Sequence, residues 1–144
     1  MIAVDTNILV YAHRADSPWC LKSDRVIADL AEGNYPWAIP WPCLNEFLAI
    51  VTHPRIYNPP TPLTDALAQI GCWLESPSLV LLNEGEGFFP VWERAVRESA
   101  LVGGAVHDAR VAALCIYHGV KKLLTSDRDF SRFPRLRTEN PLLE

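Results

Sequence analysis

The sequence lacks any apolar run of the roughly 18 residues that a helix needs to cross a bilayer. It also lacks the basic, apolar and small-residue succession of a secretory signal, because Asp5 interrupts the only apolar segment at the N-terminus. We therefore expect a cytoplasmic protein with no membrane partner.

Paired cysteines are also missing. The four cysteines show no CxxC pair or other spacing typical of a zinc or redox site, which argues against both kinds of site. Each of them lies among apolar residues, and this predicts buried free thiols. They are Cys20, Cys43, Cys72 and Cys115.

An excess of positive charge is absent as well. The formal net charge of −4 argues against a protein that binds nucleic acid by general electrostatic attraction. Basic residues are nevertheless concentrated between Lys121 and Arg137. This segment is either a solvated surface or a basic rim beside an acidic site.

What the sequence does contain is the pattern of one α/β domain over residues 1–144. Short apolar runs predict strands, and helical spacing or helix-start and helix-stop residues predict the helices between them. Strands that read as continuous apolar runs favour a parallel sheet covered on both faces. The expected strands are 1–4, 37–39, 78–83 and 121–127, and the expected helices are 6–14, 16–34, 42–53, 61–76, 89–102 and 105–119.

Four acidic residues stand in apolar surroundings. Asp5 and Asp127 each follow a predicted strand, and functional sites of parallel sheets form at the carboxyl ends of strands. Asp108 opens a mostly apolar helix. Glu46 lies within another helix that is apolar on nearly every side, so we expect its side chain to be largely buried.

Simpler explanations exist for each acid taken alone. Asp5, Asp108 and Asp127 stand where a helix or turn begins and are equally compatible with N-capping. Arg110 is available as an ion-pair partner, but one arginine cannot serve four carboxylates. If the four acids share one pocket, each pair at about 5 Å costs roughly 3 kcal/mol at an effective dielectric near 20.

A divalent cation removes this repulsion. Mg²⁺ and Mn²⁺ prefer oxygen ligands, whereas zinc favours the clustered Cys and His that this sequence lacks. Such a cation activates a bound water and neutralises charge on a phosphoryl group. Asp5, Glu46, Asp108 and Asp127 therefore form a predicted Mg²⁺ or Mn²⁺ site suited to phosphate substrates.

Four motifs, in this order, resemble the PIN domain family and its VapC-type ribonuclease toxins. They are "VDTNILVYA", "NEF", "HDA" and "LLTSDRDF", and they span the chain from Asp5 to Phe130. The resemblance implies a three-layer α/β/α sandwich with a central parallel sheet. It also implies cleavage of RNA phosphodiester bonds by a metal-activated water, in the toxin of a toxin–antitoxin pair.

The resemblance also implies roles for single residues. Asp5 and Asp108 match direct metal ligands, and Asp127 binds directly or through water. Glu46 orients or deprotonates the attacking water, or holds a second metal ion. Asp129 is a fifth candidate, and a solvent-facing turn residue is the alternative reading of it.

Three neighbouring residues have simple alternatives. Asn7 and Thr125 match residues that orient ligand carboxylates, with an ordinary helix or strand position as the alternative. His107 precedes Asp108, and packing at the helix end is favoured over general-base catalysis. For the five tryptophans, core packing is favoured over stacking on unpaired bases.

The expected partners are an RNA substrate, single-stranded or structured, a cognate antitoxin protein and a second copy of the chain. Trp19, Trp37 and Trp41 are predicted to offer apolar surface to an antitoxin helix. A haloacid dehalogenase-type phosphatase is disfavoured, because Asn7 stands where that chemistry needs a second acid. A non-catalytic PIN-like module that binds RNA or protein is the other alternative.

Overall fold

The computed structural model describes residues 1–143, in which five strands form one sheet in the order β3–β2–β1–β4–β5. Every strand pairing is parallel. The strands are β1 (Ile2–Val4), β2 (Trp37–Pro40), β3 (Leu79–Leu82), β4 (Lys122–Leu124) and β5 (Thr138–Glu139). The α-helices are α1 (Thr6–His13), α2 (Cys20–Glu32), α3 (Trp41–Val51), α4 (Leu63–Leu74), α5 (Phe88–Ser99) and α6 (Val106–Tyr117).

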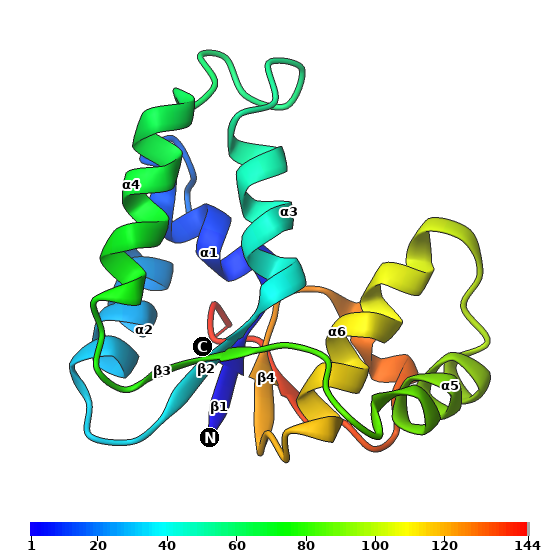
Figure 1. Ribbon diagram of the computed structural model, residues 1–144. Helices are drawn as coiled ribbons and strands as arrows, with labels where there is room; N and C mark the ends of the chain where they lie inside the picture. Colours follow the sequence, from blue (N-terminus) through cyan, green and yellow to red (C-terminus); the bar gives the residue numbers. More distant parts are fainter. Residues whose placement is uncertain (144) are drawn as a thin grey trace.

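Helices cover both sides of this sheet, so the predicted three-layer α/β/α sandwich is confirmed. In Figure 1, α1, α2 and α4 lie on one side of the strands, and α5 and α6 lie on the other. Helix α3 stands over the carboxyl ends of the strands, with α4 beside it. Helices α3 and α6 therefore lie on opposite sides of the carboxyl ends of the strands.

Helix α6 packs against the sheet with a buried side that includes three alanines. Ala109, Ala112 and Ala113 are fully buried, and α6 contacts β2 and α5. Small side chains permit a short distance between helix and sheet, which preserves dense packing. The close packing fixes the start of α6, where His107 and Asp108 lie.

Every predicted strand and helix is present, with ends that differ by up to four residues, and the structure adds the strand β5. Strand β5 was not predicted, because a two-residue strand carries no periodic pattern. The 78–83 run was expected to be buried, but Val80 of β3 is 39% exposed. Strand β3 is an edge strand, so one side of it lacks a neighbouring strand.

The cysteine prediction is right for two residues. Cys43 and Cys115 are buried free thiols, whereas Cys20 is half-buried and Cys72 is exposed. Helix α4 buries only Ala66 and Trp73, so Cys72 faces solvent despite its apolar neighbours in sequence. No helix among residues 1–143 has both the length and the apolar character required to cross a membrane.

Candidate active site

The candidate site forms where β1 and β4 end and α6 begins. The backbone amide of Asp5 donates to the carbonyl of Leu124 at 3.0 Å, which joins the ends of the two strands. Asp127 follows β4 by three residues, and Asp108 lies in the first turn of α6. Parallel strands thus bring acids together that are far apart in the chain.

Three carboxylates form the closest group. Asp108, Asp127 and Asp129 each present an oxygen, and these oxygens all lie within 4.8 Å of one another. Asp129 is exposed, as its alternative reading predicted, yet its carboxylate belongs to this group. Asp5 and Glu46 lie outside this tight group among the residues described.

Asp5 is buried and held by donors from three segments. Its Oδ2 accepts hydrogen bonds from the Thr125 hydroxyl at 2.7 Å and from the Asn7 amide at 3.2 Å. The Cys43 thiol lies 3.6 Å from Oδ1 and donates to it. Burial raises the pKa of Asp5, although these hydrogen bonds oppose the rise, as expected for a desolvated carboxylate.

Asn7 and Thr125 have the positions predicted for residues that orient a carboxylate. The Asn7 amide also donates to the Thr125 hydroxyl at 3.2 Å, and the Asn7 carbonyl accepts from the Ser126 amide at 3.2 Å. The Thr125 oxygen accepts from the backbone amide of Asp127 at 3.0 Å. One small network therefore fixes Asp5 and the backbone of Asp127 together.

Asp108 shows the electrostatic effect of this crowding. Burial raises its pKa first, and the charges of Asp127, Asp5, Glu46 and Asp129 add to the effect, for a value of about 6. A carboxylate responds in this way when like charges lie within several ångströms. Each of the other four acids is therefore within electrostatic range of Asp108.

Glu46 corrects one prediction. Its side chain is exposed on α3 rather than largely buried, because the buried side of α3 consists of Cys43, Leu44, Phe47 and Val51. Partial desolvation against the protein surface and the charge of Asp5 still raise its pKa, and nearby His107 lowers it. Glu46 therefore faces the acids from the solvent side.

His107 is also placed differently from the favoured reading. It is exposed in the first turn of α6 and does not pack at the helix end. Its electrostatic effect on Glu46 places it across from α3. The sequence offered one indication that His107 lies near the acids, because it directly precedes Asp108.

The simpler explanations account for little of this arrangement. Asp5 is the N-cap residue of α1 but makes no capping hydrogen bond, and Asp108 does not cap α6. Asp127 does cap the short 3₁₀ helix η2 (Arg128–Arg132), because its Oδ1 accepts from the amide of Asp129 at 2.9 Å. The ion-pair partner of Arg110 is Glu84 and none of the predicted acids.

The donor set fits a hard divalent cation. The three clustered ligands are carboxylate oxygens, and Mg²⁺ and Mn²⁺ prefer such donors. Within residues 1–143, none of the five acids has an ion pair with lysine or arginine. Their negative charge is thus not balanced by the protein itself.

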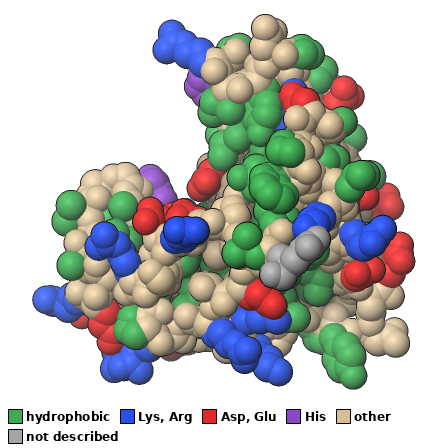
Figure 2. Space-filling model, turned by 180° about the vertical axis from the view of Figure 1, so that it is seen from behind, with side chains coloured by type: hydrophobic (Ala, Val, Ile, Leu, Met, Phe, Trp, Pro, Cys, Tyr) green, Lys and Arg blue, Asp and Glu red, His purple; other side chains and the backbone are tan. Residues whose placement is uncertain are grey.

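Two of these acids, Glu46 and Asp127, line hollows in the surface. Figure 2 shows acidic side chains and a histidine gathered between the two raised parts of the molecule. One hollow of about 400 Å³ lies between α3 and α6 and includes Glu46 and His107. A second, of about 340 Å³, includes Asp127 and Arg128. Glu46 and Asp127 are therefore reachable by a polymeric substrate.

Comparison with known proteins identifies the family. The PIN domain pattern matches residues 2–136. The chain belongs to the PIN domain family. This PIN domain is 32% identical to Ribonuclease VapC43 of Mycobacterium tuberculosis over 142 residues, which cover 99% of this chain and 96% of that protein. It is 29% identical to Ribonuclease VapC48 of the same species, over 95% of this chain and 94% of that protein.

Solved structures share the fold. The toxin–antitoxin complex VapBC2 from Rickettsia felis, bound to a promoter DNA fragment, matches with a TM-score of 0.70 at 22% identity, over 97% of this chain and 98% of the other. VapC20 of M. tuberculosis, a toxin that cleaves the sarcin–ricin loop, matches with a TM-score of 0.67 at 18% identity, over 91% and 93%. The predicted resemblance to PIN domains and VapC-type ribonucleases is therefore confirmed.

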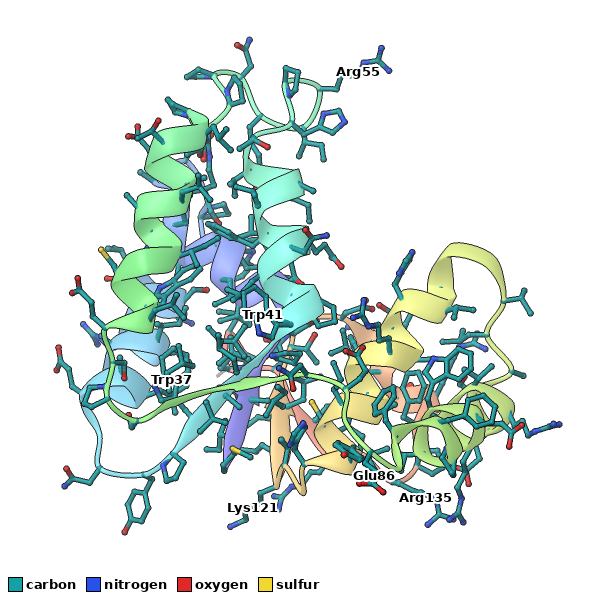
Figure 3. The ribbon with its side chains drawn as sticks, viewed as in Figure 1. Trp37, Trp41, Arg55, Glu86, Lys121 and Arg135 are labelled. Atoms are coloured by element: carbon teal, nitrogen blue, oxygen red, sulfur yellow. The ribbon has the colours of Figure 1, made fainter. Side chains whose placement is uncertain are left out.

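Three residues of the C-terminal basic segment, Lys121, Lys122 and Arg135, do not form a rim to this site. Figure 3 shows Lys121 and Arg135 far from the end of the sheet that α3 covers. Lys122 pairs with Glu139, and Arg135 pairs with Glu98. These basic residues belong to the solvated surface, because Lys122 begins β4 and the acids lie beyond its end.

The tryptophans divide between core and surface. Trp37 on β2 is fully buried and donates to the Ser76 hydroxyl at 3.1 Å, so its predicted role in antitoxin binding is wrong. Trp73 is buried as well, which agrees with core packing. Trp19 and Trp41 are 40% and 45% exposed, so core packing is wrong for both.

Proposed function

We propose that this PIN domain, spanning residues 1–144, hydrolyses RNA phosphodiester bonds as the toxin of a VapC-type toxin–antitoxin pair. The observation that carries the proposal is the meeting of Asp108, Asp127 and Asp129, with Asp5 and Glu46 in electrostatic range. Relatives named as ribonucleases support RNA as the substrate.

Asp5, Glu46, Asp108 and Asp127 are the proposed catalytic and metal-binding residues, with Asp129 as a further ligand. Mg²⁺ or Mn²⁺ bound there would offset the charge of the cluster and act as a Lewis acid toward the phosphodiester. Cysteine and histidine are absent from the close carboxylate group, which favours these ions over zinc.

The remaining chemistry belongs to the side chains. Asn7 and Thr125 hold the Asp5 carboxylate in one orientation through hydrogen bonds of 3.2 and 2.7 Å. Glu46 accepts a proton from the attacking water, because its carboxylate faces solvent and its raised pKa suits a general base better than an ordinary glutamate.

The test is cleavage of a fluorescently labelled single-stranded RNA pool with Mg²⁺, with Mn²⁺ and with EDTA. Cleavage by the wild-type chain that is lost with EDTA and in Asp108→Asn supports the nuclease. Asp65→Asn on the exposed side of α4 is the matched control and should cleave normally. Binding of RNA without cleavage under any of these conditions would favour a non-catalytic module.

An antitoxin protein and a second copy of the chain are the proposed protein partners, in the cytoplasm. Helix α4 presents Leu63, Leu67 and Leu74 to solvent, with exposed fractions of 58, 50 and 46%. An exposed apolar stripe at this spacing is suited to contact another protein. Light scattering of the purified chain, alone and co-expressed with the neighbouring gene product, measures both assemblies.

A further inference from the structure

We propose that the hollow between α3 and α6 binds one unpaired nucleotide next to the phosphodiester that is cleaved. In this subsite Trp41 stacks on the base, Asn45 reads its edge, and Arg110 binds a phosphate. This inference rests on the proposed ribonuclease function and specifies how the same site binds its substrate.

Glu46 links the hollow to the other acids. It has a volume of about 400 Å³, and its lining includes Glu46 on one wall and His107 on the other. Glu46 is within electrostatic range of Asp5 and Asp127. If an RNA strand places one phosphodiester over the carboxylates, the adjacent nucleotide therefore lies at this hollow.

Trp41 supplies a surface for stacking. It begins α3 directly after β2 and is 45% exposed, although tryptophan is usually highly buried. Asn45, which lines the hollow, lies four residues later and therefore neighbours Trp41 on the helix surface. Trp41 is not among the residues that line the hollow, but the next residue, Pro42, is. An exposed aromatic ring near a polar cleft is typical of proteins that bind single-stranded nucleic acid.

Asn45 supplies hydrogen-bonding groups that can discriminate between bases. Its side chain is exposed in the hollow, and no residue of the described range 1–143 hydrogen-bonds with it. An amide offers both a donor and an acceptor, which complement the edge of an unpaired base. The free amide therefore favours a base rather than a bare phosphate at this position.

Arg110 supplies the positive charge. It lines the same hollow from α6 and pairs with Glu84, which follows β3. Both side chains are well exposed, at 45% and 36%, so the pair contributes little to stability. Glu84 contacts only Nε of this guanidinium, whereas a phosphate can accept two parallel hydrogen bonds from it, so RNA can replace Glu84 at small cost.

The experiment measures kcat and KM with single-stranded RNA in Mn²⁺ for Trp41→Ala and Arg110→Ala. Each variant should raise KM about tenfold and leave kcat within about twofold, because stacking and phosphate contacts act on binding. Trp41→Phe keeps an aromatic ring and should restore most of the affinity. Thermal midpoints confirm that each variant is folded.

Matched controls lie outside the hollow. Trp19→Ala removes a tryptophan of similar exposure, and Arg97→Ala removes an exposed arginine paired with Glu93 on α5. Both should leave KM unchanged. In RNAs that carry one abasic nucleotide at successive positions, one position should weaken wild-type binding and remove the effect of Trp41→Ala.

The outcomes separate the two proposals. If the wild-type chain cleaves RNA and both hollow variants keep its KM and cleavage pattern, the subsite is wrong and the nuclease stands. If the wild-type chain cleaves no RNA with either metal, the proposed function itself fails.

Discussion

The Thr125 hydroxyl donates a hydrogen bond of 2.7 Å to the buried carboxylate of Asp5, although the two residues are 120 positions apart in the chain. The same oxygen accepts from the backbone amide of Asp127. One hydroxyl thus sets the relative position of two acids that follow different strands.

Thr125→Val should test this link, because valine has the same shape without the hydroxyl. We expect a loss of about 1–3 kcal/mol in unfolding free energy, since a buried carboxylate loses its shortest donor. Affinity for Mn²⁺ should fall too. Urea denaturation and Mn²⁺ titration measure the two effects, and Thr125→Ser should keep both near wild type. Unchanged values for the valine variant would contradict the proposed link.

Asp108→Asn should stabilise the metal-free protein at pH 7. The folded-state pKa of Asp108 is about 6, above the usual 3.8, so the folded state binds its proton more tightly than the unfolded state does. Protonation of Asp108 therefore favours the folded state. This contribution to stability is fully present below pH 3.8 and is lost as the pH rises through 6. Removing the charge should recover about 1–2 kcal/mol at pH 7 after allowance for solvent screening.

Thermal unfolding in EDTA at pH 4 and pH 7 measures this gain. The stabilisation by Asp108→Asn should be large at pH 7 and small at pH 4, where Asp108 of the folded state is protonated and carries no charge. Equal effects at the two pH values would show that like-charge repulsion is not the cause. Asp65→Asn serves as the control for loss of one charge.

Divalent cations should stabilise the folded chain. A ligand that binds only the folded state at 100 times its Kd adds about 2.7 kcal/mol. Mg²⁺ or Mn²⁺ should therefore raise the thermal midpoint in proportion to the logarithm of concentration, and EDTA should reverse the shift. The shift should disappear in Asp127→Asn and persist in Asp65→Asn. A shift of equal size in both variants would place the cation elsewhere.

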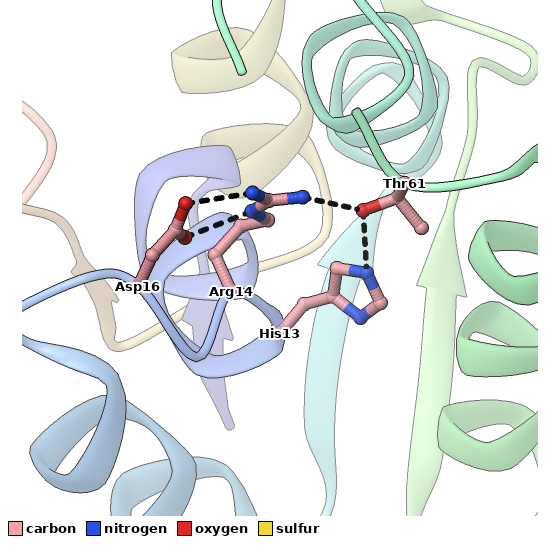
Figure 4. A network of polar contacts seen from close by, with 4 residues as sticks. All are labelled: His13, Arg14, Asp16 and Thr61. Carbon is pink, nitrogen blue, oxygen red and sulfur yellow. Dashed lines mark hydrogen bonds and ion pairs between the residues drawn. The ribbon is translucent and has the colours of Figure 1, made fainter. Parts of the chain in front are cut away.

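A polar network anchors the loop between α3 and α4 (Figure 4). The Thr61 hydroxyl contacts His13 Nε2 at 3.1 Å and accepts from Arg14 at 3.2 Å, and Arg14 also pairs with Asp16 at 2.7 Å. Thr61→Val should remove the contacts of His13 and Arg14 with the hydroxyl, but His13 keeps Gln69 and Arg14 keeps Asp16, so we expect a cost of about 0.5–1.5 kcal/mol. Urea denaturation measures the loss.

Hydrogen exchange across residues 52–62 gives a second measurement for this network. Amide protection there should fall in Thr61→Val, because the loop loses its link to the end of α1. Thr64→Val, on the exposed side of α4, is the matched control and should leave both measurements near wild type. Undiminished protection in Thr61→Val would show that the loop is held by other contacts.

The sequence by itself determined the strand and helix order, because apolar runs and helix-start residues act locally. It also indicated Asp5, Glu46, Asp108 and Asp127, since a carboxylate in apolar surroundings is costly without a partner. The four motifs, taken in their order along the chain, resemble the PIN domain family. Comparison with known proteins confirmed that resemblance.

Only the tertiary structure decided which side chains are exposed and which acids lie closest. Glu46, Cys72 and Trp37 have similar apolar neighbours in sequence, yet the first two are exposed and the third is buried. The exposure of a side chain depends on which elements pack against its helix or strand, and those elements are distant in the sequence. For the same reason Asp129 joined Asp108 and Asp127, and Arg110 paired with Glu84.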